Sequence, residues 1–268
     1  MNSVRIGVFD SGVGGLTVLK QLVEQVPGAS YVYFGDTARL PYGSKSAETV
    51  GRYALEAARF LENQGMDILV VACNTATALA LPALRDAIKV PVEGVIEPGA
   101  EAAAAATHRN RVVVIATEAT IGSHAYQRAL AQRHVQVREQ ACPLFVPLIE
   151  EGWIDHPVTQ RVAHVYLDDV FCDYETGPDV LVLGCTHYPL IKPILRGVCP
   201  WRVEIVDSAE CVARAVSRRL GCEAPAGPPA SRTPITYFAT DSVERFRNLG
   251  QLFMGHAIEE VKLVSLGE

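Results

Sequence analysis

ILVVACNTAT at residues 68–77 and VLVLGCTHYP at residues 180–189 are the two stretches that decide the fold of this chain. Each begins with an apolar run typical of a buried strand and ends in a cysteine followed by polar residues. Each is followed by apolar residues suited to a helix. A buried strand followed by a helix is the basic unit of an α/β fold, and such folds bind ligands beyond the carboxyl ends of their parallel strands. Cys73 and Cys185 therefore both fall where chemistry is expected.

The two stretches belong to a longer internal repeat. The cysteines are 185 − 73 = 112 residues apart, and the strand ends at Asp10 and Thr117 are 117 − 10 = 107 residues apart. Two strand ends that recur with nearly one offset indicate a duplication. We therefore predict two similar α/β domains with mainly parallel sheets, related by a pseudo-two-fold axis, with the active site in the cleft between them.

The domain boundaries follow from a third similarity. YFATD at residues 237–241 resembles YFGDT at residues 33–37, so the C-terminal segment is expected to return to the first half. The predicted domains are residues 1–97 with 208–268, which carry Cys73, and residues 98–207, which carry Cys185. Residues 221–234 are rich in glycine and proline and are expected to form a linker or long surface loop.

Composition and charge exclude several classes of protein. The chain has 268 residues, of which 49% are hydrophobic, as is typical of a globular protein. A net charge of −6 without a basic patch argues against nucleic-acid binding. No apolar stretch is long enough for a transmembrane helix, and no signal peptide precedes the first expected strand, so we predict a cytoplasmic protein. The oligomeric state is open, with a homodimer as one expectation.

Cysteine usage argues against structural bridges. The seven cysteines are odd in number and form no CxxC pair, so neither a disulfide framework nor a metal cluster is expected. Five of them are interpreted as small buried hydrophobic residues: Cys142, Cys172, Cys199, Cys211 and Cys222.

The first expected strand, at residues 4–9, ends in Asp10 and Ser11 and is followed by GVGG. Glycines permit a tight turn and a close approach of a ligand to the backbone. The phosphate-binding spacings are absent, and Asp10 would repel a phosphate. An acid at this strand end suits a substrate ammonium group or proton transfer, and a helix cap is the alternative.

The two thiols at matching strand ends are the strongest functional signal. A helix N-terminus lowers the pKa of a thiol, and His187 beside Cys185 is suited to proton transfer. One cysteine with a histidine would indicate a nucleophile, as in a cysteine amidohydrolase. Two thiols facing one cleft favour racemisation or epimerisation, in which one takes a proton from a carbon and the other gives one to the opposite face. A non-catalytic solute-binding protein is a further alternative.

The chain also resembles the cofactor-independent aspartate/glutamate racemase family, and within it the members that act on glutamate. The matching stretches span residues 8–191 in order, and VDSAE at residues 206–210 extends the match: VFDSGVGGLTVL, YFGDTARLPYG, VVACNTATA, GVIEPG, CPLFVPLIEEG and VLGCTHYPLI. The resemblance implies two α/β domains and a reaction without pyridoxal phosphate, any other cofactor or a metal. It implies interconversion of L- and D-glutamate, which supplies D-glutamate for peptidoglycan synthesis, cell wall biogenesis and cell shape.

The same resemblance assigns residue roles. It implies that Cys73 deprotonates D-glutamate and that Cys185 deprotonates L-glutamate. The implied assisting polar groups are Asp10, Glu150 and His187, with Asp36 as a lesser candidate. The implied substrate contacts are Asp10, Ser11, Tyr42, Gly43, Asn74, Thr75, Thr117, Thr120, Thr186 and His187.

Three expectations complete the prediction. A racemase of a related amino acid such as aspartate stays an alternative, as does a cysteine amidohydrolase that uses Cys73 and a histidine. Some family members carry an N-terminal extension and respond to a cell-wall precursor. Because the first strand begins by about Val4, we expect no such extension and activity independent of nucleotide-sugar precursors.

Overall fold

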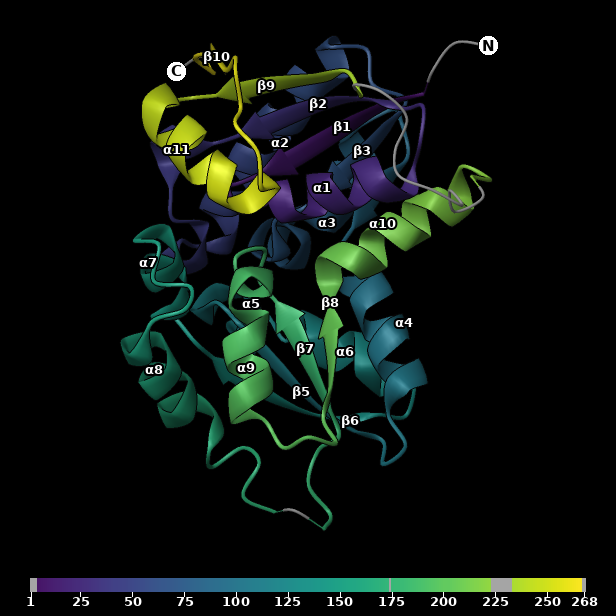
Figure 1. Cartoon of the computed structure of the whole chain (residues 1–268). Helices are drawn as coiled ribbons and strands as arrows, with labels where there is room; N and C mark the ends of the chain where they lie inside the picture. The colour runs from purple at the N-terminus through teal and green to yellow at the C-terminus, as the bar shows by residue number, and fades with distance from the viewer. Residues whose placement is uncertain (1–3, 174, 223–232, 267–268) are drawn as a thin grey trace.

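The computed structural model describes residues 4–173, 175–222 and 233–266. It contains two sheets, each covered by helices, which lie one above the other in Figure 1. All strand pairs within the described residues are parallel. This confirms the predicted α/β class with two parallel sheets. We call each sheet with its covering helices a lobe.

The first lobe is built on a six-stranded sheet. Its strands are β1 (Arg5–Asp10), β2 (Ser30–Gly35), β3 (Ile68–Val71), β4 (Val92–Gly94), β9 (Ile235–Ala239) and β10 (Lys262–Leu263), in the order β10-β9-β2-β1-β3-β4. Its helices are α1 (Leu16–Gln25), α2 (Ala47–Asn63), α3 (Asn74–Ala87) and α11 (Val243–Met254), with short 3₁₀ turns η1 (Thr37–Arg39) and η2 (Tyr42–Ser44). The pairing of β9 with β2 confirms that the C-terminal segment returns to the first half.

The second lobe is built on a four-stranded sheet. Its strands are β5 (Arg111–Ala116), β6 (Gln136–Ala141), β7 (Val180–Gly184) and β8 (Glu204–Asp207), in the order β6-β5-β7-β8. Its helices are α4 (Ile96–Ala106), α5 (Glu118–Gly122), α6 (Ala125–Ala131), α7 (Phe145–Glu150), α8 (Pro157–Leu167), η3 (Tyr188–Ile191) and α9 (Lys192–Val198). Helix α10 (Ser208–Arg219) leaves the end of β8 and runs beside α1 and α4, so it joins the two lobes (Figure 1). The predicted domain division, 1–97 with 208–268 and 98–207, stays a prediction.

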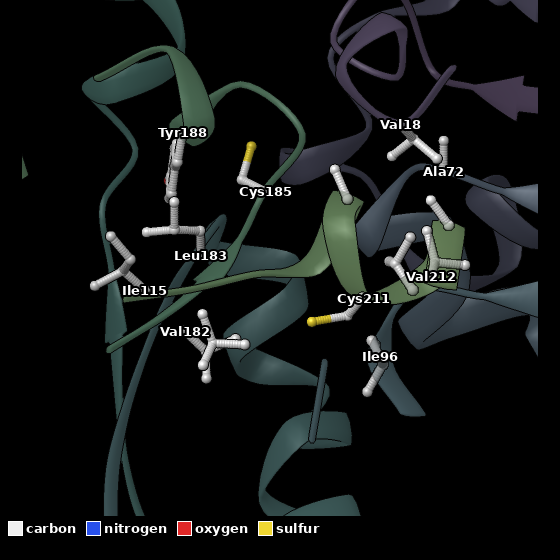
Figure 2. Close-up of a cluster of buried hydrophobic side chains, with 14 of the residues drawn as sticks. Val18, Ala72, Ile96, Ile115, Val182, Leu183, Cys185, Tyr188, Cys211 and Val212 are labelled. Atoms are coloured by element: carbon white, nitrogen blue, oxygen red, sulfur yellow. The ribbon is translucent and has the colours of Figure 1, made fainter. Parts of the chain in front are cut away.

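Alternation along the strands separates two cores. Ile6 and Val8 of β1 belong to one hydrophobic cluster, whereas Phe9 belongs to the other, because successive side chains of a strand point to opposite faces. The cluster around Phe9 is confined to the first lobe, where α2 and α3 cover the sheet. The cluster around Ile6 continues into the second lobe: Figure 2 shows Val18 and Ala72 of the first lobe together with Val182 and Leu183 of the second. One of the two hydrophobic clusters is therefore shared by both lobes.

The structure also differs from the expected elements. Strand β6 was not predicted, because it is a partly exposed edge strand that carries polar residues, as edge strands often do. Cys185 is followed by the turn η3 before α9 rather than directly by an α-helix. Pro193 has no N–H for a bond to the carbonyl at position 189, which separates the turn from the helix. Residues 223–232 of the expected linker lie outside the described residues.

The interpretation of the five other cysteines was partly wrong. Cys142, Cys199 and Cys211 are buried, as expected, but Cys222 is only partly buried and Cys172 is exposed. Cys172 lies beyond the end of α8, where its neighbour Asp173 is also exposed to solvent. Across the described residues, no helix combines the length and the apolar character needed to cross a membrane.

Candidate active site

A cavity of about 390 Å³ lies at the carboxyl ends of the central strands of both sheets. Most of the predicted site residues line it: Ser11, Tyr42, Gly43, Cys73, Asn74, Thr75, Thr117, Glu150, Cys185, Thr186 and His187. Asp10 and Thr120 are buried behind this lining. Residues from both lobes therefore bring most of the expected side chains to one place.

Cys73 occupies the N-cap of α3. The Ala76 N–H donates a hydrogen bond to its Sγ at 3.4 Å, and Ser11 Oγ lies 3.4 Å from the sulfur. We expected the helix N-terminus to lower the thiol pKa. Instead, burial and the charge of Asp10 raise the pKa of Cys73 to about 12, although the Ser11 and Ala76 hydrogen bonds act the other way. Cys73 is therefore a neutral thiol that carries its proton near pH 7.

Cys185 lies just beyond β7 and has a charged neighbour. Its Sγ is 4.0 Å from His187 Nδ1, and His187 Nε2 is 3.1 Å from Glu150 Oε1. Burial opposes a charged imidazole, but the hydrogen bonds and charges of Cys185 and Glu150 outweigh it and raise the pKa of His187 to about 10. The Cys185 sulfur therefore lies beside a cation, whereas the charge of Asp10 acts on Cys73. The two thiols thus sit in different electrostatic surroundings.

Glu150 is the last residue of α7 and has two cationic partners among the described residues. Oε1 faces His187, and Oε2 accepts a hydrogen bond from Arg245 Nη2 of α11 at 3.0 Å. Burial alone would raise the pKa of Glu150, but His187 and Arg245 together lower it. Glu150 is therefore an ionised partner for the imidazolium.

Asp10 ends β1 beneath the GVGG turn. Its Oδ2 accepts a hydrogen bond from the Gly12 N–H at 2.9 Å, whereas Oδ1 is buried with no hydrogen-bond partner among the described residues. Burial raises the pKa of Asp10, with opposing contributions from backbone N–H groups and from His187. A Cβ at Gly15 would lie 2.5 Å from Asp10 Cβ, so this turn can wrap the carboxyl group only with glycine there.

Three threonine hydroxyls meet across the lobe boundary. Thr75 Oγ1 lies 3.0 Å from Thr117 Oγ1 and 3.2 Å from Thr120 Oγ1, and the last two are 2.9 Å apart. Thr75 is in α3 of the first lobe, whereas Thr117 caps α5 of the second. Adjacent hydroxyls at two helix N-termini form a donor set suited to a carboxylate.

Some predicted contacts also hold the framework together. Asn74 Oδ1 accepts a hydrogen bond from the Tyr126 hydroxyl at 2.7 Å, which ties α3 to the second lobe. The Tyr42 hydroxyl donates to Asp36, and the Tyr42 ring is buried against Phe9, so only part of this residue reaches the cavity. Asp36 itself is fully buried and does not line the cavity; it holds the loop that carries Tyr42 and Gly43.

Sequence reasoning missed part of the lining. The further lining residues are Gly12, Val13, Leu40, Pro41, Ser44, Glu118, Pro143, Val146, Pro147 and Gly184. Most of them fall inside or beside the stretches that carried the resemblance, such as LPYGS and CPLFVP. Their position in those motifs was therefore the sequence feature from which they could have been predicted to line the site. Val146 and Pro147 add an apolar wall on α7, which suits aliphatic carbons of a ligand.

Similarity to known proteins places the chain in a family. A family model for Asp/Glu/Hydantoin racemases matches residues 6–216. The chain belongs to this racemase family. The match confirms the resemblance, and the protein is accordingly an isomerase of this family.

Individual relatives are similar over nearly their whole length. A glutamate racemase of Koribacter versatilis (strain Ellin345) is 55% identical, over 98% of this chain and 97% of the relative. The crystal structure of glutamate racemase from Thermus thermophilus in complex with beta-chloro-D-alanine is 45% identical, with a TM-score of 0.85 over 98% of both chains. The structure from Francisella tularensis in complex with D-glutamate is 34% identical, with a TM-score of 0.88 over 99% of both chains.

Proposed function

We propose that the protein interconverts L- and D-glutamate without a cofactor, with Cys185 and Cys73 acting on opposite faces of Cα. The observation that carries the proposal is the placement of both thiols. They follow equivalent strands of the two lobes, line one cavity and are each only 6% exposed. The two thiols are close enough together for the charge of Cys185 to raise the pKa of Cys73.

The electrostatics support a defined first step with L-glutamate. The Cys185 thiolate, beside the His187 imidazolium, takes the Cα proton. The neutral Cys73 thiol gives its proton to the opposite face of the carbanion. The products are D-glutamate, a Cys185 thiol and a Cys73 thiolate. The reverse reaction starts from this state, so each thiol is base in one direction and acid in the other.

The polar groups around the thiols support binding and charge stabilisation. The hydroxyls of Ser11, Thr75 and Thr117 are donors for the substrate carboxylates, with Thr120, Asn74, Thr186 and Gly43 as the surrounding contacts. Such donors are most effective where negative charge develops, here on the carboxylate adjoining the carbanion. Asp10, with an unpaired buried oxygen, is suited to the substrate ammonium group and to protons leaving Cys73. Glu150 keeps His187 charged.

The relatives favour glutamate over the alternatives. Those named above are glutamate racemases, and one was solved with D-glutamate. An aspartate racemase or an amidohydrolase leaves these names unexplained, and an amidohydrolase has no need of a second thiol. The proposed role is supply of D-glutamate for peptidoglycan in the cytoplasm, in keeping with the family. A homodimer stays a prediction.

The direct test follows the circular dichroism of L-glutamate with the purified protein, dialysed against chelator and without pyridoxal phosphate. We expect the signal to decay to zero, while L-aspartate is unchanged and glutamine releases no ammonia. Racemisation of aspartate instead of glutamate, or ammonia release without racemisation, would overturn the proposal.

A further inference from the structure

Glu150 connects the two lobes beside the cavity. It ends α7 in the second lobe, and its Oε2 accepts a hydrogen bond from Arg245 of α11 in the first lobe at 3.0 Å. Figure 1 shows α11 directly above α7, although the two residues are 95 positions apart in the sequence. The other oxygen of the same carboxylate faces His187. One carboxylate thus stands between a guanidinium from one lobe and the imidazole of the other.

We propose that Arg245 is a positioning residue for the half of the reaction carried by Cys185. From the first lobe it keeps Glu150 ionised and oriented, and Glu150 in turn holds His187 as an imidazolium against the Cys185 sulfur. This inference rests on the proposed function, because it gives Arg245 a role in a proton transfer at Cys185.

The groups around His187 show how the contacts from Arg245 through Glu150 reach the imidazole. Among the described residues, the titratable groups that act on the imidazole are the Cys185 sulfur, 4.0 Å from Nδ1, and Glu150 Oε1, 3.1 Å from Nε2. The Asp10 carboxyl group acts on it through its charge. Helix α11 also touches the ring directly, because the Phe253 ring meets it edge-on at a centroid distance of 5.2 Å. Helix α11 therefore contacts the imidazole directly through Phe253 and indirectly through Arg245 and Glu150.

Exposure separates the roles of the two residues of the ion pair. The Arg245 side chain is 61% exposed, whereas Glu150 is only 16% exposed. Exposed ion pairs contribute little to folding on their own. Loss of Arg245 should leave the fold intact while removing one of the two cations that stabilise the Glu150 carboxylate. The pKa of Glu150 would then rise, and its orientation toward His187 would loosen.

Racemisation itself cannot report on one thiol alone. The equilibrium constant between enantiomers is one, so kcat/KM must be equal in the two directions for every variant. A half-reaction avoids this constraint. With 3-chloroglutamate, one thiol removes the Cα proton, the Cβ–Cl bond breaks and chloride leaves. The resulting enamine tautomerises and is hydrolysed by water to 2-oxoglutarate and ammonia. Elimination from the L configuration then depends on Cys185, and from the D configuration on Cys73.

The experiment compares Arg245→Gln and Arg245→Lys by the rate of chloride release from each configuration. We expect Arg245→Gln to slow elimination from the L configuration about tenfold or more and to leave the D configuration within about twofold. Lysine should restore most of the loss, because it keeps the charge. The acidic limb of the pH profile for the L configuration should move to higher pH in Arg245→Gln. In a Glu150→Gln background, Arg245→Gln should add no further loss.

A matched control is available on the same helix. Arg247 pairs with Glu244 within α11 and donates to the Ile258 carbonyl, but it has no contact with Glu150 among the described residues. Arg247→Gln should leave both eliminations unchanged. Equal slowing of both configurations by Arg245→Gln, the same selective loss in Arg247→Gln, or a full extra loss in the Glu150→Gln background would overturn the inference. Cys185→Ala tests the proposed function separately: if it fails to abolish elimination from the L configuration, the thiol assignment itself is wrong.

Discussion

The hydroxyl oxygens of Thr75 and Thr117 lie 3.0 Å apart, although the two residues belong to different lobes. Each hydroxyl lies at the start of a helix, α3 or α5, so both share the partial positive charge of a helix N-terminus. The pair therefore joins the lobes where a ligand carboxylate is expected. This geometry leads to the first prediction.

Thr117→Val should raise the KM for glutamate about tenfold, because valine keeps the shape of threonine but removes a donor, and a tenfold change in affinity corresponds to about 1.4 kcal/mol. Thr117→Ser retains the hydroxyl and should keep a nearly normal KM. Steady-state kinetics of both variants check this, with thermal melting to confirm the fold. An unchanged KM in Thr117→Val would remove Thr117 from the substrate contacts.

Cys73→Ala and Cys185→Ala should each reduce racemisation by at least about 10²–10⁴-fold, the range typical of general acid–base groups. In deuterated water, early product from either enantiomer should carry deuterium at Cα, because the opposite thiol delivers a solvent-derived proton. The remaining substrate should stay largely undeuterated. Mass spectrometry of both pools measures this. Near-normal racemisation by Cys185→Ala would mean that one base performs both transfers.

His187 should make the folded state less stable at alkaline pH. Its pKa is raised to about 10 in the folded protein, against about 6.5 when unfolded. The folded state therefore retains a proton that the unfolded chain releases, so this contribution is complete below about pH 6.5 and is lost as the pH rises to 10. The Tm of the wild-type protein should exceed that of His187→Gln at pH 6, and the difference between the two Tm values should shrink as the pH approaches 10.

An exposed histidine provides the comparison for that experiment. His164 pairs with Asp168 on the surface of α8, so His164→Gln should show a much smaller gap at any pH. A gap for His187→Gln that is constant from pH 6 to 10 would contradict the raised pKa.

Alkylation should reveal which thiols face the cavity. Cys172 is exposed and should react first, so the experiment is best performed in a Cys172→Ser variant. In that background, bound glutamate should slow the labelling of Cys73 and Cys185 at least severalfold. Labelling of the partly buried Cys222 should be unaffected and serves as the internal control. Peptide mass spectrometry after limited alkylation measures all three. Equal rates with and without glutamate would place the substrate elsewhere.

The parts of the site that could be predicted from the sequence are those set by local pattern. Apolar runs ending at Cys73 and Cys185 identify strand ends, and the ends of parallel strands meet at one edge of a sheet. Burial could not be derived in this way. The pKa of Cys73 is raised rather than lowered, because desolvation by both lobes outweighs the helix N-terminus. Arg245 carried no signal, because an arginine on an amphipathic helix is usually a solvated residue, and its partner is 95 positions away.

The core that runs from Ile6 and Val8 into Val182 and Leu183 has a consequence for the origin of this architecture. If the halves arose by duplication, they have since become inseparable. Residues 98–207 expressed alone would expose to water the apolar side chains that now meet α10, and the fragment should aggregate rather than fold. The whole chain should unfold in one cooperative transition. The enzyme would then be a single folding unit in which the positions of both sulfurs depend on one shared core.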